Sequence, residues 1–232
     1  MEVQSPKNLV PKFFGKTAST YDKIAIWTTF GKDRYWKKEI LNQVHSGSSF
    51  LDLACGTGIL TRAIAEKFPD AKVVGVDITQ SYLDVAKENS KNYKNISYIL
   101  QDAEQLSLDG KFDCITSSYI PKYCDAEVLV KVCMAHLNPN GKIVLHDFTY
   151  PGNPVVQKLW DLYFVILNFV GLFISSWKEA FEELPSLIRS SNWLDDFKKV
   201  MKENGLKVEE RCLTWHSSAI VVGTKQQFSQ EN

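Results

Sequence analysis

The 232-residue chain lacks the features that mark several protein classes. It has no excess of charge, because 27 lysines and arginines balance 27 aspartates and glutamates. Proteins that bind nucleic-acid backbones usually carry a basic face, so this balance disfavours nucleic acid as a partner. The five cysteines are odd in number and include no CxxC pair, which disfavours a disulfide framework and a zinc site. We expect no metal ion and a reducing compartment, the cytoplasm.

Long apolar runs are also missing. A helix needs roughly twenty apolar residues to span a bilayer. The most apolar stretch, "LYFVILNFVGLFI" at 162–174, is shorter and contains Asn168 and Gly171. The opening stretch "MEVQSPKNLVPKFF" has no apolar signal-peptide core. We therefore expect residues 162–174 to form a buried helix or an apolar lid over a hydrophobic site.

Short apolar strands alternate with helical patterns from Phe50 onward, which predicts an α/β fold with a parallel sheet covered on both faces. Strands are expected at 49–54, 71–77, 95–102, 111–118 and 142–148, and helices at 58–68, 80–89 and 125–137. The stretch "NPNG" at 138–141 predicts a turn in which Gly141 takes a positive φ. Residues 205–215 and 217–225 predict an antiparallel hairpin at the sheet edge, which brings the sheet to seven strands.

The length suits a single domain over residues 1–232. Two portions are expected to stand outside the sheet. The expected parts are an N-terminal helical cap at 8–45, a ligand-binding core at 46–150, an apolar helical insert or lid at 151–192, and a C-terminal helix with the hairpin at 193–232.

The stretch "FLDLACGTGILT" at 50–61 places two glycines between an expected strand and an expected helix. That arrangement points backbone N–H groups at a ligand. A P-loop would need GxxxxGK[ST], and no such lysine follows Gly56. A dinucleotide fingerprint would need a third glycine, and that position holds Thr61. The pattern favours the S-adenosylmethionine (SAM) site of class I methyltransferases; simple turn geometry at Gly56 and Gly58 is the plainer alternative.

The other strand ends carry side chains suited to SAM. Asp77 and Ile78 end the second strand, where a carboxylate can accept hydrogen bonds from both ribose hydroxyls. Asp102 and Ala103 end the third, where a carboxylate and an amide can recognise the adenine edge. Ser118 ends the fourth, beside the methyl group. Such folds bind ligands at this edge of the sheet. A surface acid that caps the next helix is the alternative for Asp77.

The motifs "LDLACGTGILT", "VVGVDIT", "DAEQL" and "HLNPNGKIVLHDF" resemble the ubiquinone/menaquinone biosynthesis C-methyltransferases. The stretches "FGKTASTYDKIAIWTTFGKDRYWKK" and "LTWHSSAIVVGTK" are also similar to that family, so the resemblance covers almost the whole chain. It implies a Rossmann-like class I methyltransferase fold, SAM as cofactor, and methyl transfer to a ring carbon of a polyprenylated quinol. It also implies SAM contacts at Thr61, Asp77, Asp102, Ala103 and Ser118.

The chain departs from the family after the serine. Where the family has Phe-Gly-apolar-Arg-Asn, this chain has "YIPKY", so Lys122 and Tyr123 replace the Arg and Asn that the family places at its reacting centre. A lysine does not reproduce the planar fork of an arginine. A base that removes a phenolic proton would assist the reaction. His146, at the end of the fifth strand, is a candidate base; a structural histidine is the alternative.

Two cofactor contacts and the insert complete the predicted site. Asp52 would face the SAM amino group or the glycine-loop amides, unless it is purely structural, and Tyr21 of the cap would close over SAM, unless it is a core residue. Five aromatic residues of the insert would line a groove for a prenyl tail, contact lipid headgroups or pack in the core: Trp160, Phe164, Phe169, Phe173 and Trp177.

The expected partner is a small lipophilic quinol. The sequence allows a peripheral membrane contact and a homodimer without requiring either. A methyltransferase of another small molecule, a phenol, lipid or amine, is the main alternative. A non-catalytic scaffold with the SAM fold is a further one, although a pure scaffold has no physical need for Asp77 and two bare glycines.

Overall fold

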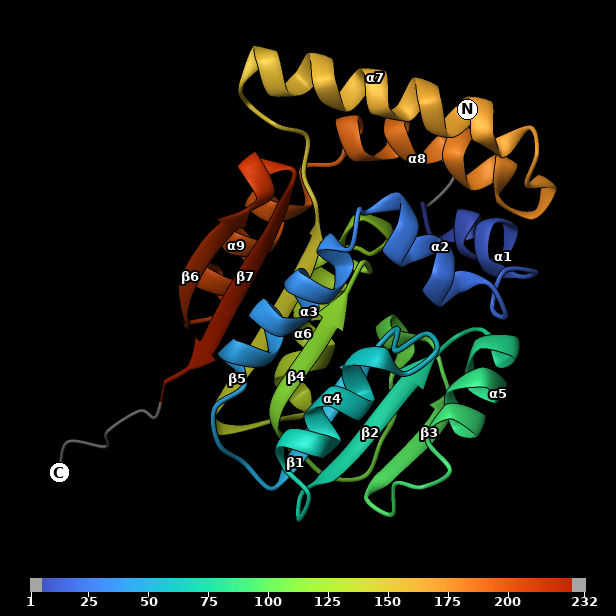
Figure 1. The fold of residues 1–232 in the computed structure, drawn as a ribbon. Helices are drawn as coiled ribbons and strands as arrows, with labels where there is room; N and C mark the ends of the chain where they lie inside the picture. Colours follow the sequence, from blue (N-terminus) through green and yellow to red (C-terminus); the bar gives the residue numbers. More distant parts are fainter. Residues whose placement is uncertain (1–5, 227–232) are drawn as a thin grey trace, which may run out of the picture.

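A computed structural model describes residues 6–226, which fold as one sheet with helices on both faces (Figure 1). The strand order is β3-β2-β1-β4-β5-β7-β6. The strands are β1 (Ser49–Leu53), β2 (Lys72–Asp77), β3 (Ile96–Leu100), β4 (Phe112–Ser118), β5 (Leu137–Phe148), β6 (Leu206–Leu213) and β7 (Ser218–Lys225). β1 to β5 run parallel, and β7 pairs antiparallel with both β5 and β6. The predicted seven-stranded sheet with its C-terminal hairpin is confirmed.

The helices begin where the local sequence supplies a cap or a turn. Asp125 accepts the Val128 N–H at 3.0 Å and starts α6, and Asn153 accepts the Val155 N–H at 2.9 Å ahead of Pro154 in α7. The α-helices are α1 (Leu9–Phe14), α2 (Tyr21–Thr28), α3 (Lys32–Gln43), α4 (Ile59–Lys67), α5 (Gln80–Asn89), α6 (Ala126–Ala135), α7 (Pro154–Gly171), α8 (Lys178–Ser190) and α9 (Trp193–Glu203).

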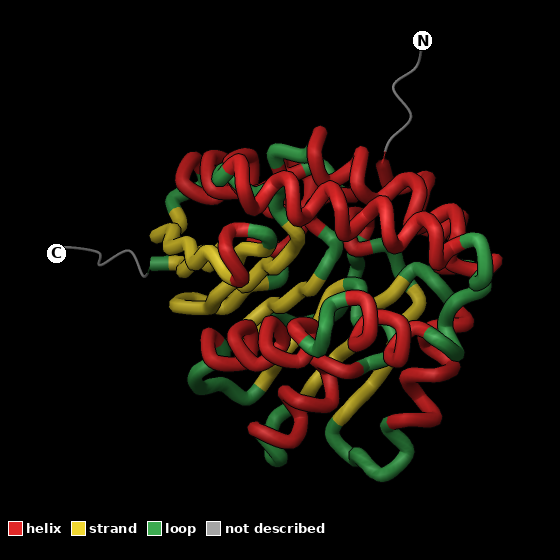
Figure 2. Tube along the Cα trace, turned by 45° about the horizontal axis from the view of Figure 1, so that its top comes forward, coloured by secondary structure: helices red, strands yellow, loops and turns green. Residues whose placement is uncertain are grey.

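Two apolar layers cover the two faces of the sheet. Alternate residues of β1 divide between them, because successive side chains of a strand point to opposite faces. Phe50 packs with residues of α3 and α4, whereas Leu51 packs with residues of α6 and α9. Figure 2 shows the strands between helices on both sides. The two layers hold the carboxyl ends of the parallel strands in one row, and the site lies at that row.

A third apolar cluster forms above these strand ends. It joins Phe13 of α1 to Phe164 and Leu167 of α7 and to Phe181 of α8. Figure 1 shows α7 and α8 side by side over the end of the sheet, with α1 and α2 beneath them. Over residues 6–226, no helix combines the length and the apolar character needed to cross a membrane. The cap and the insert therefore roof the site together.

The prediction of a turn at "NPNG", residues 138–141, is wrong. Residues 137–148 form one continuous strand, β5, with a register irregularity where it pairs with Phe112 and Cys114 of β4. The left-handed residue is Asn140, with φ of 62°, and Gly141 has no positive φ. A Cβ at Gly141 would lie 2.8 Å from the Leu137 side chain, so this glycine is needed for close packing instead.

Candidate cofactor and acceptor site

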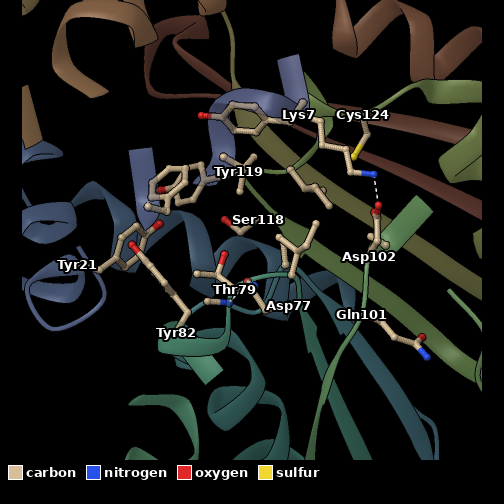
Figure 3. A pocket seen from close by; sticks show the side chains of 18 residues that line it. Lys7, Tyr21, Asp77, Thr79, Tyr82, Gln101, Asp102, Ser118, Tyr119 and Cys124 are labelled. Carbon is tan, nitrogen blue, oxygen red and sulfur yellow. Dashed lines mark hydrogen bonds and ion pairs between the residues drawn. The ribbon is translucent and has the colours of Figure 1, made fainter. Parts of the chain in front are cut away.

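A cavity of about 110 Å³ lies at the carboxyl ends of β1 to β4, and we call it the cofactor cavity (Figure 3). The strand ends form its floor, and the N-terminal segment supplies its cover. Its lining residues are Lys7, Val10, Phe14, Tyr21, Ala54, Gly56, Asp77, Ile78, Thr79, Tyr82, Gln101, Asp102, Ala103, Ser118, Tyr119, Ile120, Tyr123 and Cys124. The topology thus brings together strand ends that are far apart in the sequence.

The two glycines of the first turn have different roles. Both have positive φ, 56° at Gly56 and 79° at Gly58. A Cβ on Gly56 would come no closer than 3.6 Å to the Tyr82 ring, so bare backbone faces the cavity there. A Cβ on Gly58 would come within 2.3 Å of the Tyr98 hydroxyl, and Gly58 does not line the cofactor cavity. Gly56 is placed for a ligand, and Gly58 for packing at the start of α4.

Asp77 ties the glycine turn to the end of β2. Its Oδ2 accepts the Gly56 N–H at 2.9 Å, and its Oδ1 accepts the Thr79 N–H at 2.8 Å. Burial raises the pKa of this carboxyl group, and the same N–H groups oppose the rise. A carboxylate has about four acceptor positions. Acceptor capacity therefore remains on Asp77 for the hydroxyls of a ligand.

Lys7 lies across the third strand end. Its ammonium group pairs with Asp102 and with Glu104, the latter at 2.8 Å, and Figure 3 shows it meeting the Asp102 carboxylate at one side of the cavity. Desolvation disfavours the charged lysine, but the two carboxylates raise the pKa of Lys7 overall. Ala103 lies beside Asp102 in the cavity wall. The residue pair predicted for adenine recognition is thus covered by a cation from the N-terminal segment.

A smaller cavity of about 30 Å³ continues from the first, and we call it the polar cavity. The two cavities share Tyr21, Ala54, Gly56, Ser118 and Tyr119. Asp52 lines the polar cavity and accepts the Thr61 hydroxyl at 2.7 Å and the Thr116 hydroxyl at 3.0 Å. Burial raises the pKa of Asp52 to about 6, although both hydroxyls and Lys37 oppose the rise. Thr61 lines neither cavity and acts through Asp52.

A third cavity of about 340 Å³, the apolar cavity, lies between the cap and the insert. Side chains of α1, α2, α7 and α8 form most of its wall, and the turn before β7 adds Trp215. Three of the predicted aromatic residues line it: Trp160, Phe164 and Trp177. Phe169 and Phe173 do not, and they are 63% and 76% exposed. The insert therefore uses its aromatic residues on two faces.

Tyr21 and Tyr119 line all three cavities. Tyr119 has φ of 75°, which is strained for a bulky residue and persists only where the surroundings hold it. Its hydroxyl donates to Asp33 Oδ1 at 2.8 Å, and its ring stacks on Phe148 with centroids 5.0 Å apart. A methyl donor in the cofactor cavity and an acceptor in the apolar cavity would therefore meet between these two tyrosines.

Lys122 forms a buried ion pair below the apolar cavity. Its Nζ donates to Asp147 Oδ1 at 2.7 Å and to the Tyr119 carbonyl at 3.0 Å. Its Nζ also lies 4.5 Å from the centroid of the Tyr123 ring and 5.7 Å from that of Phe148. Desolvation lowers the pKa of Lys122, and Asp147 opposes this. Two of the three ammonium donors are used, which leaves one for a ligand.

Tyr123 lies where the cofactor cavity and the apolar cavity adjoin. Its side chain is buried, and its hydroxyl has no hydrogen-bond partner among the residues that the structure describes. Burial raises the pKa of Tyr123 well above its ordinary value, so it keeps its proton. An unpaired buried hydroxyl is unfavourable unless a ligand or water completes it. Tyr123 is therefore placed to donate a hydrogen bond to a molecule in the apolar cavity.

His146 is fully buried and lines neither the cofactor cavity nor the apolar cavity. Its Nδ1 lies 3.1 Å from the Ser118 hydroxyl, and its Nε2 lies 2.7 Å from the Ser218 hydroxyl. Burial, with Lys37 and Lys122 nearby, lowers its pKa well below the ordinary value, so His146 is neutral. The geometry makes it a positioning partner of Ser118 and gives it no direct contact with an acceptor.

Sequence reasoning missed several residues of the cavities. Thr79 follows the predicted contacts Asp77 and Ile78, and Gln101 precedes Asp102, so the same argument from strand ends could have found both. Lys7 and Phe14 come from the N-terminal segment, so no local pattern indicates them. The role of Tyr119 depends on a left-handed backbone that a tyrosine rarely adopts. Cys124 also lines the cofactor cavity, and burial raises its pKa, so it remains a thiol.

These residues fit SAM. Asp77 would accept hydrogen bonds from the ribose hydroxyls, and Ile78 and Ala103 would give apolar contacts beside Asp102 for the adenine; all four residues line the cofactor cavity. The polar cavity, with the carboxylate of Asp52, suits the charged amino-acid end. Within residues 6–226, no group of three or more His, Cys, Asp and Glu side chains is placed to hold a metal ion.

Comparison with known proteins gives one consistent result. The chain matches the ubiE/COQ5 methyltransferase family over residues 1–225. It is 34% identical to a ubiquinone/menaquinone biosynthesis C-methyltransferase UbiE of Francisella philomiragia, over 91% of this chain and 89% of that protein. It is 29% identical to a demethylmenaquinone methyltransferase of Staphylococcus carnosus, over 96% and 95%. The magnesium protoporphyrin IX methyltransferase of Synechocystis, solved with S-adenosylhomocysteine, has a similar fold, with a TM-score of 0.62, 15% identity, and coverage of 95% and 100%.

Proposed function

Since the chain belongs to the ubiE/COQ5 methyltransferase family and is a SAM-dependent methyltransferase, we propose that its acceptor is a prenylated hydroquinone, methylated at a ring carbon. One observation carries this proposal. The apolar cavity adjoins the cofactor cavity at Phe14, Tyr21, Tyr119 and Tyr123. A lipophilic methyl acceptor in one cavity can therefore contact the methyl donor in the other. Relatives named for ubiquinone and menaquinone biosynthesis support the same substrate class.

Bound SAM supplies an electrophilic methyl group. A hydroquinone ring carbon attacks it more readily when a neighbouring hydroxyl has lost its proton to water, and the ring carbon releases its own proton to water once it carries the methyl group. The free N–H of Lys122 would donate to that oxygen and favour its ionised form, while Asp147 holds the ammonium group in place. Donors fixed in a site that excludes water stabilise developing charge strongly. Lys122 thus supplies the charge that the family obtains from arginine.

Tyr123 would orient the ring by donating its unpaired hydroxyl to an acceptor oxygen. Tyr21 and Tyr119 would hold the ring edge toward the cofactor cavity. The prenyl tail would follow the aromatic wall made by Trp160, Phe164 and others of the cap and insert. Apolar burial is worth about 25 cal/mol per Å², so a tail that fills this cavity would contribute most of the acceptor affinity.

The direct test is methyl transfer from radiolabelled SAM to a short-tailed prenyl hydroquinone that lacks one ring methyl. We expect label in the organic phase, and mass analysis with NMR should place the new methyl group on a ring carbon. The control substrates are the same hydroquinone without its prenyl tail, a simple phenol and a primary amine. Efficient labelling of oxygen or nitrogen in one of these, with none on the hydroquinone carbon, would contradict the proposal and favour another small-molecule methyltransferase.

SAM affinity is expected to rise with pH through about 6 if Asp52 faces the SAM amino group, because burial raises the pKa of Asp52 to about 6. The protonated carboxyl cannot attract a cation. One pH unit below a pKa only about a tenth of a group is ionised, so affinity at pH 5 should be roughly tenfold weaker than at pH 7.5. Calorimetry across this range measures it, with Asp52→Asn as the control that should flatten the profile. A wild-type affinity independent of pH would remove Asp52 from the contact set.

We also propose that the outer face of α7 meets a lipid surface. Eight large apolar side chains of α7 and the residues just after it are each more than half exposed: Val155, Leu159, Leu162, Val165, Ile166, Phe169, Leu172 and Phe173. Leu159 also lines the apolar cavity, as do the exposed Phe30 and Trp215. The exposed face is thus continuous with the entrance that a prenyl tail would use, and contiguous apolar surface of this kind marks an interaction site.

Vesicle sedimentation tests this surface. The wild-type chain is expected to pellet with phosphatidylcholine–phosphatidylglycerol vesicles, and the double change Phe169→Ser with Phe173→Ser to reduce the bound fraction several-fold. Val128→Ser, which removes a partly exposed side chain from α6, is the control. If the wild type stays in solution as a homodimer that the double change dissociates, α7 is instead an interface between two copies of the chain.

A further inference from the structure

The polar cavity holds one side chain of each charge. Asp52 contributes a carboxylate, and Lys37 of α3 contributes an ammonium group. The cavity is an extension of the cofactor cavity, since the two share Gly56 and Ser118 in their walls. An α-amino acid carries one positive and one negative group on the same carbon. A pocket with one fixed anion and one fixed cation is complementary to such a zwitterion.

Lys37 is held in place by a carboxylate of its own helix. Its ammonium group pairs with Asp33, one turn earlier in α3, whose side chain is 1% exposed. Its Nζ lies 5.0 Å from the centroid of the Tyr119 ring, which lines the same polar cavity. Asp33 is the one hydrogen-bond acceptor that the described residues give this ammonium group, and an ammonium group has three donors. Donors therefore remain for an anion that enters the cavity.

The carboxylate of Asp52 is likewise available to a charged ligand. Asp52 is 1% exposed, and its hydrogen bonds come from the neutral hydroxyls of Thr61 and Thr116. Neither hydroxyl neutralises the carboxylate, so a cation in the cavity would stabilise it. Lys37 acts on Asp52 only through the electric field, without a hydrogen bond between them. Both charged groups thus line the same cavity without forming an ion pair with each other.

We infer that Lys37 binds the α-carboxylate of the methionine part of SAM, with Asp52 beside the α-amino group and Asp33 as the positioning residue of Lys37. The inference deepens the cofactor assignment and is independent of which acceptor is methylated. It also gives α3 a function, because this helix carries the cation that recognises the amino-acid end.

The experiment compares SAM with decarboxylated SAM, which lacks the carboxylate alone. Calorimetry on the wild type is expected to give roughly ten- to hundredfold tighter binding of SAM, the range of one charge-assisted hydrogen bond. Lys37→Gln should weaken SAM by the same factor and change the affinity for decarboxylated SAM by less than about twofold. Lys38→Gln, at the exposed neighbouring position, should leave both affinities unchanged.

Removal of Lys37 leaves Asp33 buried without its cation, which can destabilise the fold. A second variant therefore separates a loss of folding from a loss of the carboxylate contact. The double change Asp33→Asn with Lys37→Gln removes both charges and should show the same loss of discrimination. A variant that still prefers SAM over decarboxylated SAM would overturn the inference, as would an equal loss of both ligands. If the wild type itself bound neither ligand, the cofactor assignment would fail with it, whereas absent methyl transfer to a hydroquinone would leave this result untouched.

Discussion

Asp77→Asn is expected to weaken SAM binding at least a hundredfold while the sheet stays folded. We expect the carboxylate to accept hydrogen bonds from both ribose hydroxyls, and a hydrogen bond to a charged group contributes about 1.5–3 kcal/mol. The loss of two such bonds corresponds to a factor of roughly a hundred or more in affinity. Asparagine keeps the size of the side chain and one acceptor oxygen, so one of the two backbone N–H groups at Gly56 and Thr79 can stay paired.

The choice of asparagine follows from the structure. Alanine would leave the N–H groups of Gly56 and Thr79 without their acceptor and would loosen the glycine turn, which confuses a cofactor contact with a structural one. Calorimetry with SAM measures the affinity, and thermal unfolding without ligand reports the turn. Asp84→Asn, an exposed acidic residue of α5, serves as the control. A variant that binds SAM within about threefold of the wild type would show that Asp77 only organises the backbone.

The sequence predicted the sheet and the floor of the cofactor cavity for a physical reason. In a parallel sheet every strand ends at the same edge, so Asp77, Asp102 and Ser118 had to converge once the strands were assigned. The same argument could not separate Gly56 from Gly58. Both have positive φ, and the difference lies in the Tyr98 hydroxyl, which approaches Gly58 from another strand.

The roof of the site was harder to predict. Lys7 and Lys37 reach the cavities from the N-terminal segment and the cap, and no sequence period or spacing predicts where these parts dock. The two faces of α7 were more accessible to reasoning. Trp160 and Phe164 are four residues apart, so helical geometry places them on one side of α7, whereas Phe169 comes nine residues after Trp160 and lies on the other side. Only the docking of the helix decides which side faces the cavity.

The buried ion pair of Lys122 and Asp147 could not be predicted from the sequence. "YIPKY" showed a lysine in place of an arginine, but nothing in it indicated a partner at the end of the fifth strand. The two side chains are 2% and 0% exposed, so each needs the other's charge. His146, the neighbour of Asp147, was the more familiar candidate for chemistry, yet it lies buried between the hydroxyls of Ser118 and Ser218 and does not line the cofactor cavity.

Lys122→Met is expected to lower kcat roughly 100- to 1000-fold, the usual loss when one preorganised donor to a developing oxyanion is removed. SAM affinity should change less than about twofold, because Lys122 lines the apolar cavity and not the cofactor cavity. The single change should also lower the free energy of unfolding by about 3–5 kcal/mol, since it leaves Asp147 as an uncompensated buried charge.

The double change Lys122→Met with Asp147→Asn separates these two effects. It removes both charges of the pair, so most of the lost stability should return, while kcat should stay low because no cation faces the acceptor oxygen. Denaturant unfolding and single-turnover methyl transfer measure the two quantities on the same samples. Lys32→Met is the matched control, since Lys32 lines the same cavity from an exposed position. A stable double variant with wild-type kcat would limit the buried pair to holding the turn at Pro121–Tyr123 against β5. The search for charge stabilisation would then move to Tyr123, the remaining donor at the boundary of the two cavities.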